Sequence, residues 1–327
     1  MCSSDLGEVF PLSPAPRQFN SERATFYNAL SGLTILKSPH LGEDYEGDAF
    51  VGESLSNLVI RRKLEQGTIV AQSRRATAGR EFLASTDGWF HPVFLATGPD
   101  GALYIADFYR PLVEHPIYVA SDEARQSVDW REGAGRGRIW RVIRREKGLP
   151  RSVPTPPSDL SLMELVGRLS HEVGWQRETA QRLLVEGRHV KATEAVRELL
   201  RTGATPQVRL HALWTLDGLG GLDDRDLDMA LADPVDQVRA AGVALSEARV
   251  GTDPRWSEQW ARLAVDPSPV VRLQLAASAR LLPAADQFGL LMSLMSQAAD
   301  ETPLTEVALA LAARSSGNRL EIGRAHV

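Results

Sequence analysis

Residues 98–107 carry the sequence Gly-Pro-Asp-Gly-Ala-Leu-Tyr-Ile-Ala-Asp, which predicts a reverse turn followed by a short buried β-strand. Proline presets φ at the first central position of such a turn, Asp suits the second, and glycine tolerates positive φ at the exit. Apolar side chains then occupy Leu103 to Ile105, and Asp107 ends the strand. Residues 45–145 contain further short apolar runs bounded by turn residues, so we expect β structure across that region.

A weak internal repeat places a second acid in an equivalent position. Ala-Phe-Val-Gly-Glu at 49–53 matches Leu-Tyr-Ile-Ala-Asp at 103–107, with an offset of 54 residues. That offset is within the range of one four-stranded propeller blade. In a propeller, small residues suit the innermost strand, and an acid at its end would face the mouth of the central channel. The alternative is that Glu53 and Asp107 are solvated charges at strand ends.

The second half of the chain contains a helical repeat. A three-residue motif ending in arginine recurs at intervals of 32, 30 and 33 residues, at 175–177, 207–209, 237–239 and 270–272. We expect Pro206, Pro234 and Pro267 to start the second helix of their units, with Asp233 and Asp266 as N-caps. The pattern is similar to the HEAT signature, in which the arginine commonly contacts an acid of a neighbouring unit. About five helix pairs would stack into a short α-solenoid.

The first half resembles a known protein family over about residues 20–145. The resemblance is carried by Phe50-Val51-Gly52-Glu53, by Glu-Phe-Leu-Ala-Ser-Thr-Asp-Gly-Trp-Phe-His-Pro-Val at 81–93, by residues 98–110 and by Gly-Arg-Ile-Trp-Arg-Val at 137–142. These motifs are similar to those of bacterial secreted proteins, abundant in planctomycetes, that are described as membrane-bound dehydrogenases and are related to glucose/sorbosone dehydrogenase propellers. His91 departs from the family, which generally has arginine there, and Pro111 replaces an aliphatic residue.

This resemblance implies the closing blades of an incomplete β-propeller at 7–147, a proline-rich linker at 148–157 and HEAT-like repeats at 158–320. It further implies part of a secreted or periplasmic oxidoreductase that acts on a sugar, with a PQQ-like quinone and calcium as cofactors. Earlier blades and a signal peptide would lie upstream. A c-type haem domain often follows in the family, but the single cysteine excludes a CxxCH haem site in this chain. The alternative function is a non-catalytic scaffold that binds a polysaccharide or a protein, with the protein partner on the helical repeats.

A polar cluster follows the strand that ends at Asp107. An acid beside a histidine can orient the imidazole as a general base, so His115, Asp107 and Glu114 are the candidate catalytic residues. The candidate cofactor-binding residues are Arg110 and Arg138, which could pair with carboxylates of a quinone, together with Glu53. Two alternatives stay open, namely ligand or ion binding and a structural network in which Arg110 pairs with Asp107 or Glu114. Asp87 and Asp100 could ligate calcium, although the turn already explains Asp100, and we assign no metal site.

Charge and hydropathy argue against two further classes of function, namely nucleic-acid binding and a membrane span. The net charge is −5, with −1 in residues 1–150 and −4 in the rest, so a nucleic-acid partner is not expected. The basic residues at 61–63, 74, 75 and 80 are expected to be solvated, and Trp89, Phe90, Phe94 and Tyr104 to lie in the blade core. No apolar run approaches the roughly 20 residues that a membrane span needs.

The two ends of the chain have a common explanation. Met1–Leu6 can be encoded by GTG TGC TCT TCC GAT CTC, whose reverse complement translates as Glu-Ile-Gly-Arg-Ala-His, the sequence of residues 321–326. This sequence also matches a common sequencing-library adapter. We therefore expect residues 1–6 and 321–327 to be adapter-derived, and the chain to be an internal fragment of a longer reading frame.

Overall fold

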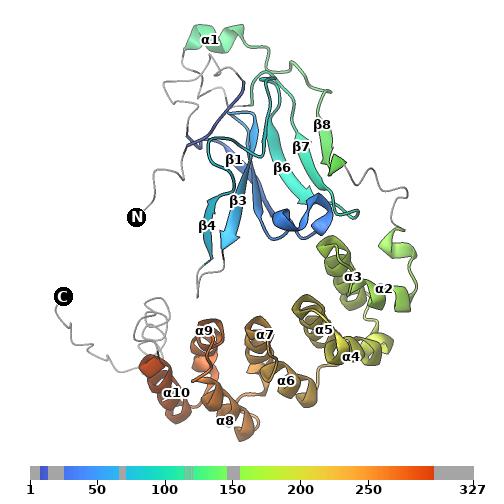
Figure 1. The fold of residues 1–327 in the computed structure, drawn as a ribbon, viewed down its shortest axis with the longest axis vertical. Helices are drawn as coiled ribbons and strands as arrows, with labels where there is room; N and C mark the ends of the chain where they lie inside the picture. The colour runs from blue at the N-terminus through green and yellow to red at the C-terminus, as the bar shows by residue number, and fades with distance from the viewer. Residues whose placement is uncertain are drawn as a thin grey trace, which may run out of the picture. The chain divides into compact units, whose positions relative to one another are not determined.

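The computed structural model describes residues 8–13, 26–65, 71–113, 115, 117, 119, 121–145 and 155–297. The chain divides into two compact units (Figure 1). The first comprises Met1–Glu65, Gln72–Asp159 and His171–Thr179, and the second comprises Gln66–Ala71, Leu160–Ser170 and Ala180–Val327. The expected order of β structure followed by α structure is confirmed. The adapter-like ends and most of the linker at 148–157 lie outside the described residues.

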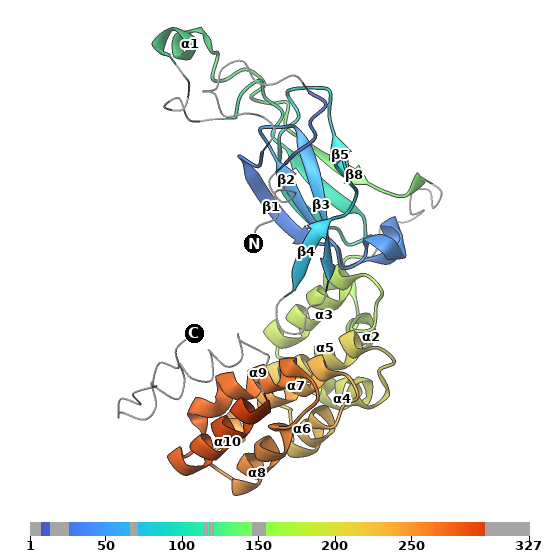
Figure 2. The same cartoon turned by 60° about the vertical axis from the view of Figure 1, so that its left-hand side comes forward.

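The first unit contains two antiparallel sheets. One has the order β1-β2-β3-β4, with β5 paired to β3, and the other has the order β6-β7-β8 (Figures 1 and 2). The strands are β1 (Leu30–Ile35), β2 (Ala49–Glu53), β3 (Leu58–Glu65), β4 (Gln72–Arg75), β5 (Leu83–Ala84), β6 (Pro92–Thr97), β7 (Leu103–Asp107) and β8 (Arg138–Val142). A core shared by the two sheets includes Phe50, Val59, Leu95, Leu103 and Ile105. A short helix, α1 (Asp122–Ser127), lies between β7 and β8.

The repeat seen in the sequence has a structural counterpart. Ala49–Glu53 forms β2 and Leu103–Asp107 forms β7, and each is the second strand of its sheet. Neither strand is an edge strand, because β2 pairs with β1 and β3, and β7 pairs with β6 and β8. The two acids therefore sit at the ends of strands that are paired on both sides.

Several predictions of which side chains are exposed and which are buried are wrong. Arg62 and Arg75 are buried rather than solvated, and Arg75 forms an ion pair of 2.6 Å with the buried carboxylate of Glu81. Phe90 lies in the core as expected, but Phe94 is 59% exposed. Phe94 points away from the core because its neighbour Leu95 takes the inner face, and side chains alternate along a strand.

The turn at 98–101 forms as the sequence predicts and is fixed by its aspartate. Gly101 has φ of 77° and donates to the Gly98 carbonyl. The Asp100 carboxylate accepts hydrogen bonds from the Ala102 amide at 3.2 Å, the Tyr104 hydroxyl at 3.1 Å and Arg141 Nε at 2.7 Å. Burial by itself would raise the Asp100 pKa, but the Ala102 amide and the Arg141 guanidinium outweigh it and lower that pKa.

We expect Asp100→Asn to lower the free energy of unfolding by about 1 kcal/mol at pH 7, because the charge-assisted bond to Arg141 is lost. A carboxyl whose pKa is lowered by folding stabilises the protein above its unfolded pKa of about 3.9, and this contribution disappears as the pH falls through the folded pKa. Urea denaturation at pH 7 and at pH 3 should therefore show a difference between variant and parent that shrinks at low pH. An equal difference at both pH values would contradict this assignment.

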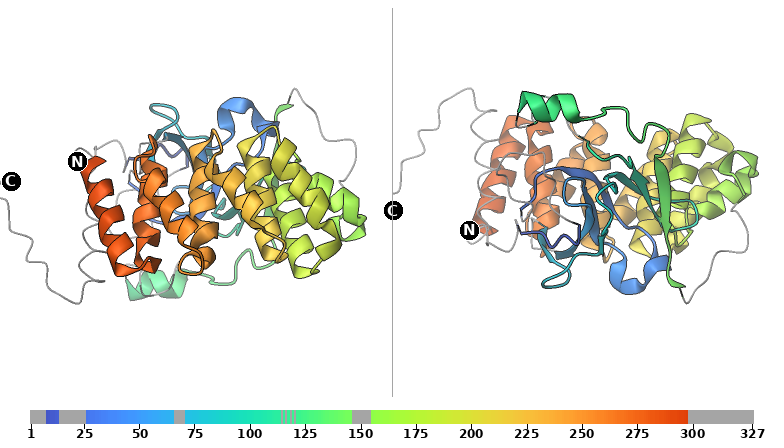
Figure 3. Two further views of the ribbon diagram at one scale, coloured as in Figure 1. Left: turned by 90° about the horizontal axis from the view of Figure 1, so that it is seen from below. Right: turned by 90° about the horizontal axis from the view of Figure 1, so that it is seen from above.

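The helical region runs from α2 to α10. Its helices are α2 (Leu162–Arg168), α3 (Gly174–Glu186), α4 (Thr193–Thr202), α5 (Pro206–Gly218), α6 (Asp224–Leu231), α7 (Asp236–Ser246), α8 (Pro254–Leu263), α9 (Pro269–Ser278) and α10 (Ala284–Gln297). Within the second unit, α5, α7 and α9 form one row and α4, α6 and α8 a second row (Figures 1 and 3). The two rows enclose a core that contains Trp256 and Trp260. None of the helices within the described part of the chain is long and apolar enough to cross a membrane.

The repeated arginines make one recurring set of contacts. Each donates from Nη1 to the carbonyl six residues earlier, as in Arg177 to His171 at 2.6 Å, Arg209 to Gly203 at 2.9 Å, Arg239 to Asp233 at 2.8 Å and Arg272 to Asp266. Arg209 also binds the Asp233 carboxylate through two nitrogens at 2.6 and 2.9 Å, and Arg239 binds Asp266 at 2.8 and 2.9 Å. We call this set the arginine ladder.

The ladder explains two wrong expectations about helix starts. Asp233 and Asp266 are not N-caps, because their carboxylates bind arginines and the amides of Val235 and Ser268. Accordingly α7 begins two residues after Pro234 and α9 two residues after Pro267, with Ser268 as the N-cap of α9. Pro206 does begin α5, with Thr205 as its N-cap.

Candidate functional site

The two strand-end acids both bind backbone amides. Glu53 is fully buried, and its Oε1 accepts from the amides of Asn28 at 3.2 Å and Ala29 at 2.7 Å. Its Oε2 accepts from the Ser56 amide at 2.5 Å. Glu53 therefore ties the segment before β1 to the turn after β2, and it is not a solvated charge.

Asp107 has the same role at the end of β7. Its Oδ1 accepts from the amides of His91 and Tyr109, both at 2.9 Å, and its Oδ2 accepts from Trp140 Nε1 at 2.9 Å. Arg138 Nε lies 3.9 Å from Oδ2. Three donors thus hold this carboxylate, and its side chain is 0% exposed, which leaves it poorly placed to accept a proton from a substrate.

Asp107 positions a partly exposed group of three rings and a cation, which we call the aromatic–arginine cluster: Trp89, Tyr109, Arg138 and Trp140. The Arg138 guanidinium carbon lies 3.5 Å from the centre of the Tyr109 ring and 5.4 Å from that of Trp140. Trp89 packs on Tyr109 with 5.4 Å between ring centres. Trp140 is 44% exposed although its indole N–H is held by Asp107.

The backbone and a second acid fix Tyr109 within this cluster. Tyr109 has φ of 37°, which is unusual for a residue other than glycine, and its amide is held by Asp107. Its hydroxyl donates to the exposed carboxylate of Asp87 at 2.9 Å. Because both ends of Tyr109 are tethered, its ring is preorganised before any ligand arrives.

The other predicted site residues that the structure describes make no contact with Asp107. His115 is exposed, and its Nδ1 accepts from the Ile117 amide at 3.3 Å. The Arg110 guanidinium lies over the Phe108 ring at 4.5 Å. Glu114 lies outside the described residues. Of the predicted set, only Asp107 and Arg138 are brought together, and the expected pairing of His115 with Asp107 is absent where both residues are described.

His91 lies between the ends of the two sheets. It is 6% exposed, its amide binds Asp107, and its Nδ1 lies 2.6 Å from the Ser54 carbonyl oxygen. Because a carbonyl oxygen can only accept, Nδ1 is the donor in this bond, and Nε2 is the second ring nitrogen. This Nε2 atom is buried and has no hydrogen-bond partner among the described residues.

No group of acids, histidines and cysteines suited to a metal ion occurs in the described part of the chain. Asp100 is engaged by the turn and by Arg141, and Asp87 binds the Tyr109 hydroxyl and the Trp89 amide.

The sequence alone did not indicate Tyr109 and Trp140 as candidate site residues. The available signal was the alternation of Arg138 and Trp140 along one strand that follows an acid.

Residues 3–146 are similar to a domain family described as a domain of unknown function, DUF7133. No curated protein matches the chain.

Proposed function

We propose that the two sheets are successive blades of a β-propeller and that the helical repeats form a HEAT-like solenoid. The way the sheets stack supports the first part. The face of the first sheet that carries Phe50, Gly52 and Val59 packs on the Leu95, Leu103 and Ile105 face of the second. The two sheets therefore contact each other through faces that are not equivalent under the repeat, and successive propeller blades stack in the same way.

The face of the second sheet that corresponds to the Phe50, Gly52 and Val59 face of the first carries exposed apolar side chains. Ala106 corresponds to Gly52 and pairs with Phe94 on one side and with Ile139 on the other. Phe94 is 59% and Ile139 is 73% exposed, whereas Val59, the counterpart of Ile139, is fully buried. A further blade that presents an aliphatic face would cover these side chains, as the second sheet covers those of the first.

We further propose that the first unit binds a polysaccharide at the aromatic–arginine cluster. The observation that carries this proposal is the rigid arrangement of the half-buried Tyr109 and the exposed Trp140 and Arg138 beside the buried Asp107. Aromatic faces bind the apolar faces of sugar rings, while a guanidinium supplies several N–H donors to hydroxyl oxygens. The resemblance to sugar dehydrogenases supports the same class of ligand.

The geometry favours binding over proton transfer. Oxidation of a sugar alcohol needs a base with a free acceptor atom near the substrate. At this end of the sheet the Asp107 carboxylate is buried and holds three donors, and His115 is not oriented by a carboxylate within the described residues. The quinone-dependent oxidoreductase implied by the family resemblance is therefore the second choice here.

We expect Arg138→Ala to weaken polysaccharide binding about ten-fold, because one stacked cation with several donors is lost. The measurement is retardation of the whole chain in native gels containing soluble starch, laminarin, xylan or hydroxyethyl cellulose. Arg131→Ala is the matched control, since Arg131 is also exposed in the loop before β8.

Two outcomes would overturn the binding proposal. One is that none of the four polysaccharides retards the parent chain, and the other is that both variants behave alike. Reduction of a dye by the chain with sugar, quinone and calcium would instead favour the oxidoreductase.

A further inference from the structure

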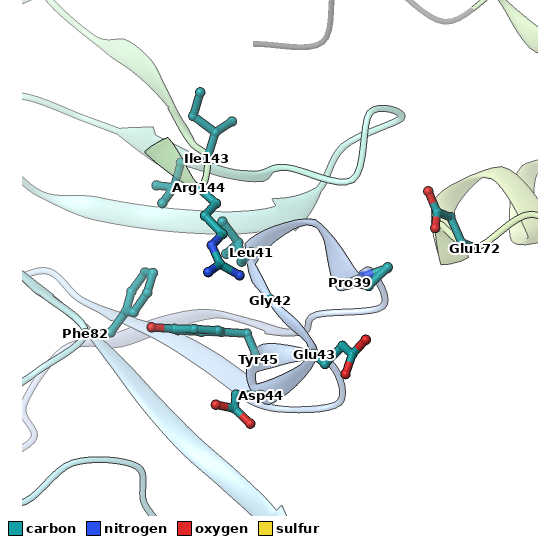
Figure 4. A pocket seen from close by; sticks show the side chains of 11 residues that line it. Pro39, Leu41, Gly42, Glu43, Asp44, Tyr45, Phe82, Ile143, Arg144 and Glu172 are labelled. Carbon is teal, nitrogen blue, oxygen red and sulfur yellow. The ribbon is translucent and has the colours of Figure 1, made fainter. Parts of the chain in front are cut away.

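A pocket of about 880 Å³ lies in the first unit at the opposite end of β8 from Arg138. It opens beside two 3-10 turns, η2 (Pro39–Leu41) and η3 (Glu43–Tyr45), and is also lined by Phe82, Val142 and Arg144 (Figure 4). Ligand pockets typically have volumes of about 300–1,000 Å³, so a mono- or disaccharide would fit here.

The aromatic wall of the pocket is held in place from behind. The Arg61 guanidinium carbon lies 3.8 Å from the centre of the Tyr45 ring, and Arg61 is itself fixed by an ion pair of 2.5 Å with Asp48. Phe82 meets Tyr45 edge-on at 6.1 Å and packs on Phe50 of the core at 4.9 Å. The two rings thus form a rigid surface, and this surface needs no rearrangement to receive a ligand.

The opposite wall carries a cation and a glycine. The Arg144 side chain points toward Tyr45 and Phe82 across the pocket (Figure 4). Gly42 has φ of 124°, and a Cβ added there would lie 3.4 Å from Tyr45 Cδ2 and 3.6 Å from Arg144 Nη1. Any larger residue at position 42 would therefore occupy the space between the ring and the guanidinium.

The charges around the pocket select against ionic ligands. Glu43, Asp44 and Glu172 bring three carboxylates to its lining, and the carboxylates of Glu43 and Asp44 point away from Arg144 (Figure 4). These carboxylates repel an anion drawn to Arg144. A cation on the aromatic wall would meet Arg61 behind Tyr45 and Arg144 opposite. An uncharged ring with hydroxyl groups satisfies both limits, because its hydroxyls accept from Arg144 and donate to a carboxylate.

We propose that this pocket binds an uncharged sugar unit, with one apolar ring face on Tyr45 and Phe82 and its hydroxyl oxygens accepting from Arg144. The site is separate from the aromatic–arginine cluster and does not rest on the function proposed for it. The two sites lie at the two ends of the short strand β8, so one ligand unit cannot occupy both.

The test uses the whole chain and isothermal titration with maltose, cellobiose, glucosamine and glucuronate as probes. We expect at least one of the two neutral disaccharides to bind more tightly than the charged monosaccharides. Arg144→Ala should weaken that binding about ten-fold, because it removes the charged donor. Arg145→Ala removes the same charge one residue away and should change the affinity less than two-fold, since Arg145 is exposed and does not line the pocket.

Further variants separate this site from the cluster and from unfolding. Tyr45→Phe keeps the ring and should keep binding, and in an Arg138→Ala background, which disables the cluster, Arg144→Ala should still weaken the remaining binding about ten-fold. The proposal is overturned if neither disaccharide binds the parent, if only a charged probe binds, or if Arg144→Ala and Arg145→Ala have equal effects. Loss of disaccharide binding in Arg138→Ala would assign the sugar to the cluster instead.

Discussion

Asp107→Ala is expected to lower the free energy of unfolding of the first unit by about 3–5 kcal/mol. The change leaves the amides of His91 and Tyr109 and the indole N–H of Trp140 without their acceptor. Each buried donor that loses its partner costs about 1–3 kcal/mol. Denaturation by guanidinium, followed by hydrogen exchange of the backbone amides in β6 and β7, would measure the effect as a lower midpoint of the transition of this unit.

Two further variants make the Asp107 prediction specific. Asp107→Asn keeps one acceptor oxygen for the two amides but turns an NH₂ group toward Trp140, so we expect a smaller loss of about 1–3 kcal/mol. Glu132→Ala removes an exposed acid from the same unit and should change the stability by less than about 0.5 kcal/mol. If Asp107→Ala were no more destabilising than Glu132→Ala, the carboxylate would not hold the strand end as described.

The second large effect is expected in the helical repeats. Asp233→Ala should lower the free energy of unfolding of the second unit by about 3–5 kcal/mol, because it leaves the mostly buried Arg209 guanidinium without its carboxylate. The same change removes the acceptor of the Val235 amide at the start of the next helix. Thermal unfolding monitored by circular dichroism at 222 nm reports on this helical unit.

Asp217→Ala on α5 provides the control, since Asp217 is exposed in the same unit. It should change the stability by less than about 0.5 kcal/mol. Equal melting temperatures for the Asp233 and Asp217 variants would mean that the arginine ladder does not stabilise the repeats.

Local patterns in the sequence were sufficient to predict part of the fold. The turn at 98–101, the strand that follows it and the recurring arginines each depend on residues close in sequence, and all three are present. The order of a β region before a helical region followed from the same patterns. The matching pentapeptides at 49–53 and 103–107 also proved to be equivalent strands.

The roles of the acids could not be predicted in the same way. Glu53 binds the amides of Asn28 and Ala29, and Asp107 binds the amide of His91, so their partners come from other segments of the chain. A strand-end acid in a sequence does not reveal whether distant amides will converge on it. The displaced starts of α7 and α9 have a similar cause, because Asp233 and Asp266 are engaged by arginines of the preceding unit.

The arginine ladder also determines how the helical repeats respond to force. Asp233 binds Arg209 through its carboxylate and Arg239 through its backbone carbonyl, so a single residue joins two consecutive units. Asp266 does the same for Arg239 and Arg272. Bending the row of helices would have to stretch these linked contacts one after another. We therefore expect the turns to contribute strongly to the elastic stiffness of the repeat array.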